Sequence, residues 1–213
     1  TGQKGATMGM NSPMRRGARR LDDRGLERVR HSLMSSGRLP ADVEASPITS
    51  SWQRSLRQHA SPERLVPIFR GAEHSDSAFA RTARPVLEAA ASRMQAEAVS
   101  LILTDPEGVV LFRWCGDPTL TGKLDGVHLA PGFVYSEAGV GTNGIGTALE
   151  TRSAFLVDGP EHFCEELNRF ACAGAPVVHP LHGTVLGVVD ITGRAGKGTP
   201  LMLSHAQLIA DQI

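Results

Sequence analysis

The chain has 213 residues, enough for one domain of ordinary size with an appendage and a substantial buried core. Its 22 basic and 22 acidic side chains balance, so the overall charge neither indicates nor excludes a nucleic-acid partner. The three cysteines are too few and too widely placed for a disulfide framework, and no apolar run resembles a membrane span or a secretion signal. We therefore expect a cytoplasmic protein with no membrane contact.

A basic stretch opens the chain. Within residues 1–20, four arginines accompany glycines without apolar periodicity, namely Arg15, Arg16, Arg19 and Arg20. This composition predicts a solvated, disordered tail, and a nucleic-acid-binding arm is the alternative interpretation. Residues 21–80 then predict a helical extension ahead of the main domain.

The extension should contain two helices. Apolar residues recur at helical spacing in residues 22–36, namely Leu26, Val29 and Leu33. Gly37 gives this helix a C-terminal stop. Ser46 and Pro47 supply the N-cap and first-turn proline of a second helix, whose apolar face includes Trp52. Because tryptophan on such a face usually belongs to the core, we expect Trp52 to be buried.

The main domain, assigned to residues 81–200, begins with an amphipathic helix near Thr82 whose first turn would hold Pro85. Short apolar runs separated by turns then predict strands at residues 99–104, 109–115, 154–157, 175–178 and 185–191. Turns at residues 105–108 and 180–183 join two pairs of them as hairpins. Hairpin-joined strands with helices at both ends and in the middle favour an α+β fold, an antiparallel sheet of about six strands flanked by helices.

A glycine-rich turn at residues 139–144 satisfies G-x-G-x-x-G. A dinucleotide-binding fingerprint needs an apolar strand directly before the first glycine. Here the preceding residues are Tyr-Ser-Glu-Ala, and Glu137 would bring negative charge close to a pyrophosphate. The better interpretation is a tight turn into a helix over residues 142–151, capped by Thr142 or Asn143.

Several short motifs occur in a fixed order along the chain. They are S-W-x-R-S at residues 51–55, S-E-x-x-x-G-T-N at 136–143, E-H-F-C at 161–164 and L-G-V-V-D-I-T-G at 186–193. In this order they resemble the sensory GAF domain of the bacterial activators of acetoin, glycerol and dihydroxyacetone metabolism, which are often sigma-54 dependent. The resemblance implies a GAF fold and a ligand-sensing, non-enzymatic role without a cofactor.

In that family the ligand lies between one sheet face and the connecting segments, which here are residues 120–146 and 158–174. Carrying the motifs across implies a set of ligand-binding residues, namely Tyr135, Glu137, Thr142, Asn143, His162, Phe163 and Cys172. The effector would be a small organic molecule of unknown identity. Tyr135 stands where the family usually has tryptophan, so the effector need not be one of the simple diols and ketones that the family binds. His179 replaces an aspartate at a turn, and we attach no chemistry to it.

The cysteines leave two alternatives open. His162, Cys164 and Cys172 are weak candidates for a zinc or iron site, because His-x-Cys is not a recognised metal spacing. A metal- or redox-sensing GAF domain is therefore the runner-up. If Cys172 lay two helical turns beyond Cys164, the pair would be too far apart for a disulfide. A GAF-fold methionine sulfoxide reductase would need a thiol of lowered pKa, and only His162 is close in sequence to Cys164.

The last segment, residues 201–213, predicts the start of a signalling helix. Its apolar residues form two stripes, one of Met202, Ala206, Ile209 and Ile213 and another of Leu201 and Leu208. Two stripes exceed what packing on one sheet requires, so we expect a homodimer mediated at least partly by the terminal helices, for which the apolar face of the first helix is a candidate complementary surface. The alternative is that both helices fold back on their own domain. DNA and RNA polymerase would be contacted only through an output module absent from this sequence.

Overall fold

The computed structural model describes residues 21–71 and 76–213. The predicted basic tail falls in residues 1–20, outside the described residues.

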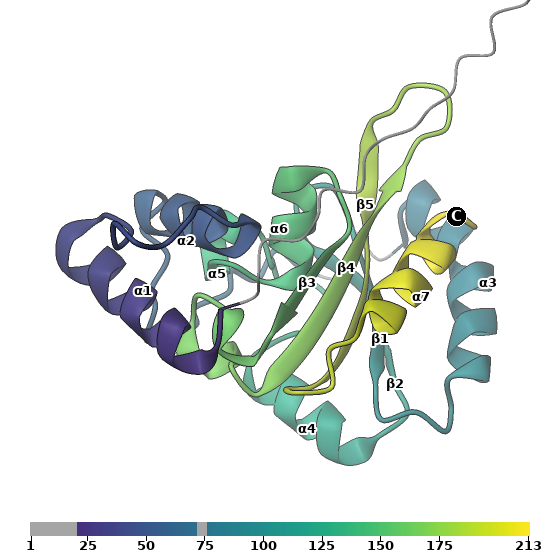
Figure 1. Ribbon diagram of the computed structural model, residues 1–213. Helices are drawn as coiled ribbons and strands as arrows, with labels where there is room; N and C mark the ends of the chain where they lie inside the picture. The colour runs from purple at the N-terminus through teal and green to yellow at the C-terminus, as the bar shows by residue number, and fades with distance from the viewer. Residues whose placement is uncertain (1–20, 72–75) are drawn as a thin grey trace, which may run out of the picture.

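A single antiparallel sheet forms the centre of the fold. Its strands are β1 Ser100–Thr104, β2 Val110–Cys115, β3 Phe155–Asp158, β4 Phe170–Val178 and β5 Val185–Arg194. They lie in the order β2-β1-β5-β4-β3, and every neighbouring pair is antiparallel (Figure 1). The α+β prediction is confirmed, with five strands in the described residues where about six were expected.

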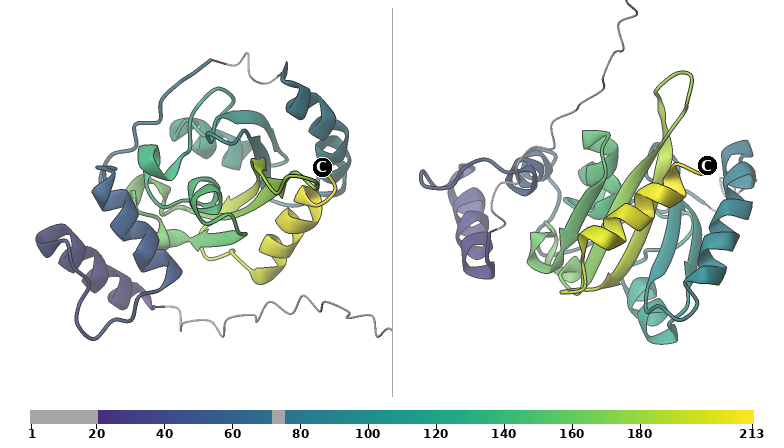
Figure 2. Two further views of the ribbon diagram at one scale, coloured as in Figure 1. Left: turned by 90° about the horizontal axis from the view of Figure 1, so that it is seen from above. Right: turned by 45° about the vertical axis from the view of Figure 1, so that its right-hand side comes forward.

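Helices cover both faces of the sheet. They are α1 Asp23–Ser36, α2 Pro47–Arg57, α3 Ala78–Arg93, α4 Pro118–Gly126, α5 Glu137–Val140, α6 Gly144–Thr151 and α7 Pro200–Ala210, with short 3-10 turns η2 Gly159–Glu161 and η3 Glu165–Leu167. The helices α3 and α7 lie on one side of the sheet, and α5 and α6 lie on the other (Figure 1). Figure 2 shows α1 and α2 beyond α5 and α6, at the far side of the molecule from α3.

The sheet separates two apolar clusters because successive strand residues point to opposite faces. On β1, Leu101 and Leu103 pack with α3 and α7, whereas Ile102 packs on the other side with α4 and α6. On β5, Val189 faces α7 and Val188 faces α6. Because of this alternation, the side chain of Asp190, which follows Val189, points toward α6. It is part of the site described below.

Three local predictions differ from the structure. The helix α3 begins after its N-cap Ser77, so Pro85 lies inside the helix, on its exposed face, rather than in its first turn. The strand β4 begins at Phe170 rather than at residue 175, because it pairs along its length with β5. Cys172 therefore lies on a strand and not on a helix. The helices α4 and α5 were not expected.

The two extension helices form a third layer with a core of their own. Gly37 ends α1 in the left-handed conformation, as the sequence indicated, and Asp22 caps its first turn. The buried residues that form this core are Leu26, Val29, Leu33, Trp52, Ala60 and Phe163. Trp52 is fully buried, as expected. The prediction that the apolar face of α1 is available to a second copy is wrong, because it packs against Trp52 and Phe163 of its own chain.

This internal packing predicts how alanine substitutions in α1 change the stability of the chain. Leu33→Ala should lower the free energy of unfolding by about 2–4 kcal/mol, because Leu33 is fully buried. Met34→Ala on the same helix should change it by less than about 0.5 kcal/mol, because Met34 is exposed. Urea unfolding of both variants measures the difference. Equal effects would contradict the docking of α1 on its own chain.

Candidate functional site

A small closed cavity lies between the sheet and the segment that leads into α6. Its volume is about 10 Å³, which is room for about one water molecule. The residues that line it are Leu129, Tyr135, Asn143, Gly144, Ile145, Leu167, Phe170, Cys172 and Asp190. Three of the seven predicted ligand-binding residues are among them: Tyr135, Asn143 and Cys172.

Two glycines set the size of this cavity by allowing α6 to lie directly on the sheet. A Cβ atom on Gly144 would lie 2.5 Å from Oδ1 of Asp190 and 2.7 Å from Cβ of Cys172. A Cβ atom on Gly174 of β4 would lie 2.1 Å from the carbonyl oxygen of Gly144. Any larger residue at either place would push the helix away, so the glycine-rich sequence serves close packing of helix and sheet.

Asn143 and Tyr135 hold the segment around the cavity in shape. The Asn143 side chain caps the N-terminus of α6, because its Oδ1 accepts a hydrogen bond from Gly146 N at 2.9 Å. Asn143 is one of the two capping residues that the sequence predicted. Its Nδ2 donates to the carbonyl oxygens of Gly141 at 2.8 Å and Tyr135 at 3.2 Å. The Tyr135 hydroxyl donates to the Val127 carbonyl, and burial raises the pKa of this phenol well above its usual value.

Asp190 is the one acidic side chain that lines the cavity. It is fully buried; Oδ2 accepts from the Thr192 hydroxyl, and Oδ1 has no hydrogen-bond partner within the described residues. Burial raises the pKa of Asp190 to about 6. The sequence analysis did not name Asp190. The available signal was a charged residue in the middle of an apolar strand, because such residues are seldom fully buried without a partner.

Glu137 and Thr142 lie outside the cavity and bind the extension helix α2. Both Glu137 oxygens accept from Arg54, from Nε at 2.7 Å and from Nη2 at 3.0 Å. The same carboxylate accepts from Ser51 at 2.5 Å and Thr147 at 3.0 Å, and Ser51 also lies 2.7 Å from the Thr142 hydroxyl. The S-W-x-R-S motif and the S-E-x-x-x-G-T-N motif thus form one buried polar cluster.

His162 and Phe163 lie where α1 and α2 meet the domain. Arg30 of α1 donates to the carbonyl oxygens of Phe163 at 2.6 Å and His162 at 2.7 Å, with its guanidinium 4.6 Å from the centre of the Trp52 ring. Trp52 Nε1 donates to the Glu161 carbonyl at 2.7 Å. His162 is fully buried with Nδ1 2.9 Å from a carbonyl oxygen, and burial lowers its pKa to about 4. These contacts fix the E-H-F-C segment to the extension.

The geometry gives no support to the metal and thiol alternatives. Among the described residues, no three His, Cys, Asp or Glu side chains are close enough to hold a metal ion, and the set His162, Cys164 and Cys172 does not form one. Burial raises the pKa of both Cys164 and Cys172, whereas a reactive thiol needs a lowered one.

None of the helices in the described ranges is long and apolar enough to cross a membrane.

Comparison with known proteins identifies the family. The family described as "MimR, N-terminal domain" matches residues 23–213. The chain belongs to this family. It is 39% identical over 188 residues to the propane 2-monooxygenase operon transcriptional activator MimR of Mycolicibacterium smegmatis, covering 88% of this chain and 32% of that protein. It is 31% identical over 170 residues to the acetoin dehydrogenase operon transcriptional activator AcoR of Bacillus subtilis, covering 76% of this chain and 28% of AcoR.

A solved structure shows the same fold. The crystal structure of the E. coli DhaR(N)–DhaL complex matches with a TM-score of 0.67 and 22% identity, over 78% of this chain and 59% of the solved one. Together with the family match and the named relatives, this shared fold confirms the resemblance to the sensory GAF domain of transcriptional activators. The chain spans about a third of the length of the curated relatives named here, which are transcriptional activators. Their names indicate a regulatory role.

Two buried groups with shifted pKa values, Asp190 and His162, predict an unusual dependence of stability on pH. Between about pH 4 and 6 the folded chain holds the Asp190 proton more tightly than the unfolded chain, so rising pH lowers stability by about 3 kcal/mol. His162 has the opposite effect, because from about pH 4 to 6.5 the unfolded chain binds its proton more tightly. These two contributions to the pH dependence of stability nearly cancel in this chain.

Asp190→Asn should remove the contribution of Asp190 to the pH dependence of stability and leave that of His162. Its free energy of unfolding should rise by about 3 kcal/mol from pH 4 to pH 7, whereas that of the unaltered chain changes much less. Chemical denaturation at a series of pH values measures both curves. Parallel curves would contradict the burial of an ionisable Asp190.

Proposed function

We propose that this chain is the effector-sensing region of a bacterial transcriptional activator, that it acts in the cytoplasm, and that it binds a small organic molecule without converting it. The main support is a closed cavity lined by Tyr135, Asn143 and Cys172 on one sheet face of a domain whose relatives are activators. Mostly apolar walls with a few convergent polar groups are typical of small-molecule sites. The remaining predicted residues, Glu137 and His162 among them, would act by holding the extension.

The signal would pass through the segment from Tyr135 to Thr147, which has a different neighbour on each side. Tyr135 and Asn143 line the cavity, whereas Glu137, Thr142 and Thr147 contact α2. The cavity in this conformation is smaller than an organic molecule, so an effector must move its wall. Because the same short segment forms that wall and the α2 contact, the effector would shift the extension between two packings.

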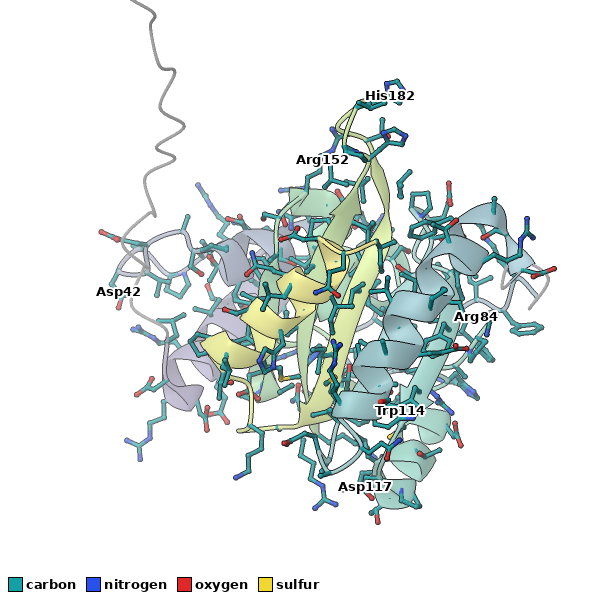
Figure 3. All side chains as sticks on the ribbon, turned by 90° about the vertical axis from the view of Figure 1, so that its right-hand side faces the viewer. Asp42, Arg84, Trp114, Asp117, Arg152 and His182 are labelled. Atoms are coloured by element: carbon teal, nitrogen blue, oxygen red, sulfur yellow. The ribbon has the colours of Figure 1, made fainter. Side chains whose placement is uncertain are left out.

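The homodimer that we propose uses α3 and α7. Leu201 and Leu208 of α7 are 63% and 57% exposed. A groove of about 900 Å³ lies beside them, with walls from both helices. Figure 3 looks onto this face, where α7 and α3 lie side by side. Exposed apolar surface of this kind is typical of an interface. Pairing there would place α7 beside its counterpart, from which the output module would continue.

A ligand screen tests the sensing role. Diols, ketones, alcohols and small phenols should include at least one that raises the melting temperature, since a ligand at 100 times its Kd adds about 2.7 kcal/mol of stability. Leu167→Ala, which removes part of the cavity wall, should extend the hits to larger members of the same series. Leu120→Ala, equally buried but outside that wall, is the control and should not. Enzymatic turnover of any hit would refute the proposal.

Sedimentation tests the dimer. Replacing Leu201 and Leu208 together with glutamate should convert a dimer to a monomer, because both side chains are exposed and the buried Met202 and Ile209 keep α7 on the sheet. The circular dichroism spectrum should not change. A matched pair of exposed apolar residues elsewhere, Val66 and Ile68, replaced in the same way, should leave the dimer intact. An unaltered chain that sediments as a monomer at tens of micromolar would refute this interface.

A further inference from the structure

We propose that Asp190 determines which effectors the cavity accepts, and that its free oxygen Oδ1 accepts a hydrogen bond from the hydroxyl group of a small alcohol in preference to the ketone of the same carbon skeleton. This inference rests on the proposed effector site and assigns its ligand class.

The position of Asp190 supports a ligand contact. The side chain is fully buried, and Oδ1 lacks a partner within the described residues. Its other oxygen is fixed, because Oδ2 accepts from the Thr192 hydroxyl. Oδ1 also lies against the first turn of α6, 2.5 Å from where a Cβ of Gly144 would be. A buried carboxylate oxygen without a donor is unfavourable, so a donor that enters the cavity gains an interaction that the protein leaves open.

The other polar groups of the cavity favour the same ligand class. The Tyr135 hydroxyl already donates to the Val127 carbonyl, which leaves its oxygen as an acceptor. Both the amide nitrogen and the amide oxygen of Asn143 are engaged in the turn that it caps. Cys172 offers a weak S–H donor. A ligand hydroxyl therefore finds a strong acceptor at Asp190, whereas a ligand carbonyl finds no strong donor among the lining side chains while Asp190 is ionised.

Protonation of Asp190 would reverse this preference. Among the groups that line the cavity, Tyr135 and Cys172 have pKa values raised by burial and stay neutral up to alkaline pH. Burial raises the pKa of Asp190 to about 6, although the hydrogen bond from the Thr192 hydroxyl acts in the opposite direction. Asp190 is thus the lining residue whose charge changes near neutral pH. Once protonated, it can donate to a carbonyl oxygen.

The apolar walls limit the rest of the ligand. Leu129, Ile145, Leu167 and Phe170 line the same cavity as Asp190, so the ligand body is apolar. The cavity of about 10 Å³ must also widen to admit it, which favours a short carbon chain. The ligand class is therefore a small aliphatic alcohol bound by one hydroxyl group.

Matched alcohol and ketone pairs test the inference on the full chain at pH 8. Dissociation constants of propan-2-ol and propanone, and of butan-2-ol and butanone, are measured by NMR titration. The alcohol of each pair should bind at least tenfold more tightly, because a hydrogen bond to a charged group is among the stronger ones in proteins. The ketones should bind more tightly as the pH is lowered from 8 to 6, and the alcohols should not.

Asp190→Asn converts the acceptor into a donor. Thr192 should keep the asparagine oxygen in place of Oδ2, so the amide NH2 takes the position of Oδ1. The alcohol-to-ketone ratio should then fall at least tenfold, mainly through tighter ketone binding that no longer depends on pH. Asp117→Asn, an equal change of charge at the half-buried N-cap of α4, is the control and should keep the original ratio.

The outcomes separate this inference from the proposed function. Binding of both members of a pair with a ratio near one, or a ratio unchanged by Asp190→Asn, would overturn the role of Asp190 and leave the effector site intact. Binding of other screened compounds but of neither class would overturn the ligand class. The absence of any binding in the wider screen would overturn both.

If Asp190→Asn does not fold, Thr192→Val serves as a second variant. It removes the hydroxyl that stabilises the Asp190 carboxylate and so raises the pKa of Asp190. Ketone binding near pH 7 should then become several-fold tighter. Unchanged ketone binding in a folded Thr192→Val chain would also overturn the inference.

Discussion

The ion pair between Glu137 and Arg54 joins the extension to the sensory domain, and the polar contacts between α2 and the domain are built around it. The Glu137 carboxylate is fully buried, and Arg54, Ser51 and Thr147 all donate to it. A buried charge that loses its partner is strongly destabilising. The helix α2 therefore cannot leave the domain without a large loss of stability. For this reason the extension and the sheet behave as one folded unit, which agrees with a family match that starts at residue 23.

Two buried carboxylates, Glu137 and Asp190, lie on opposite sides of the segment from Tyr135 to Thr147. They differ greatly in the number of hydrogen bonds that they accept. Glu137 has four hydrogen bonds from three side chains, whereas Asp190 has one bond from Thr192 and an oxygen without a partner. The first arrangement holds a structure together. The second leaves an interaction open to a molecule from solution. The segment between them, which includes Asn143, is in a position to transmit a change at Asp190 to α2.

The sequence predicted the parts of this arrangement that depend on local chemistry. The end of α1 at Gly37, the cap of α2 by Ser46, the cap of α6 by Asn143 and both hairpin turns follow from residue types within a few positions of one another. It did not predict the contact between Ser51 and Glu137, because 86 residues separate them and no local pattern records which motifs will meet. Asp190 was missed because a strand's alternation shows its face only after its neighbours are known.

The small size of the cavity strengthens the coupling that a sensor requires. A ligand shifts a conformational equilibrium only by as much as its affinities for the two states differ. A cavity of about 10 Å³ excludes an organic effector from the conformation described here, so nearly all of its binding free energy favours the widened state. Gly144 and Gly174 produce this exclusion by bringing α6 onto the sheet. The close packing that makes the cavity small is thus the feature that would make effector binding and movement of the extension inseparable.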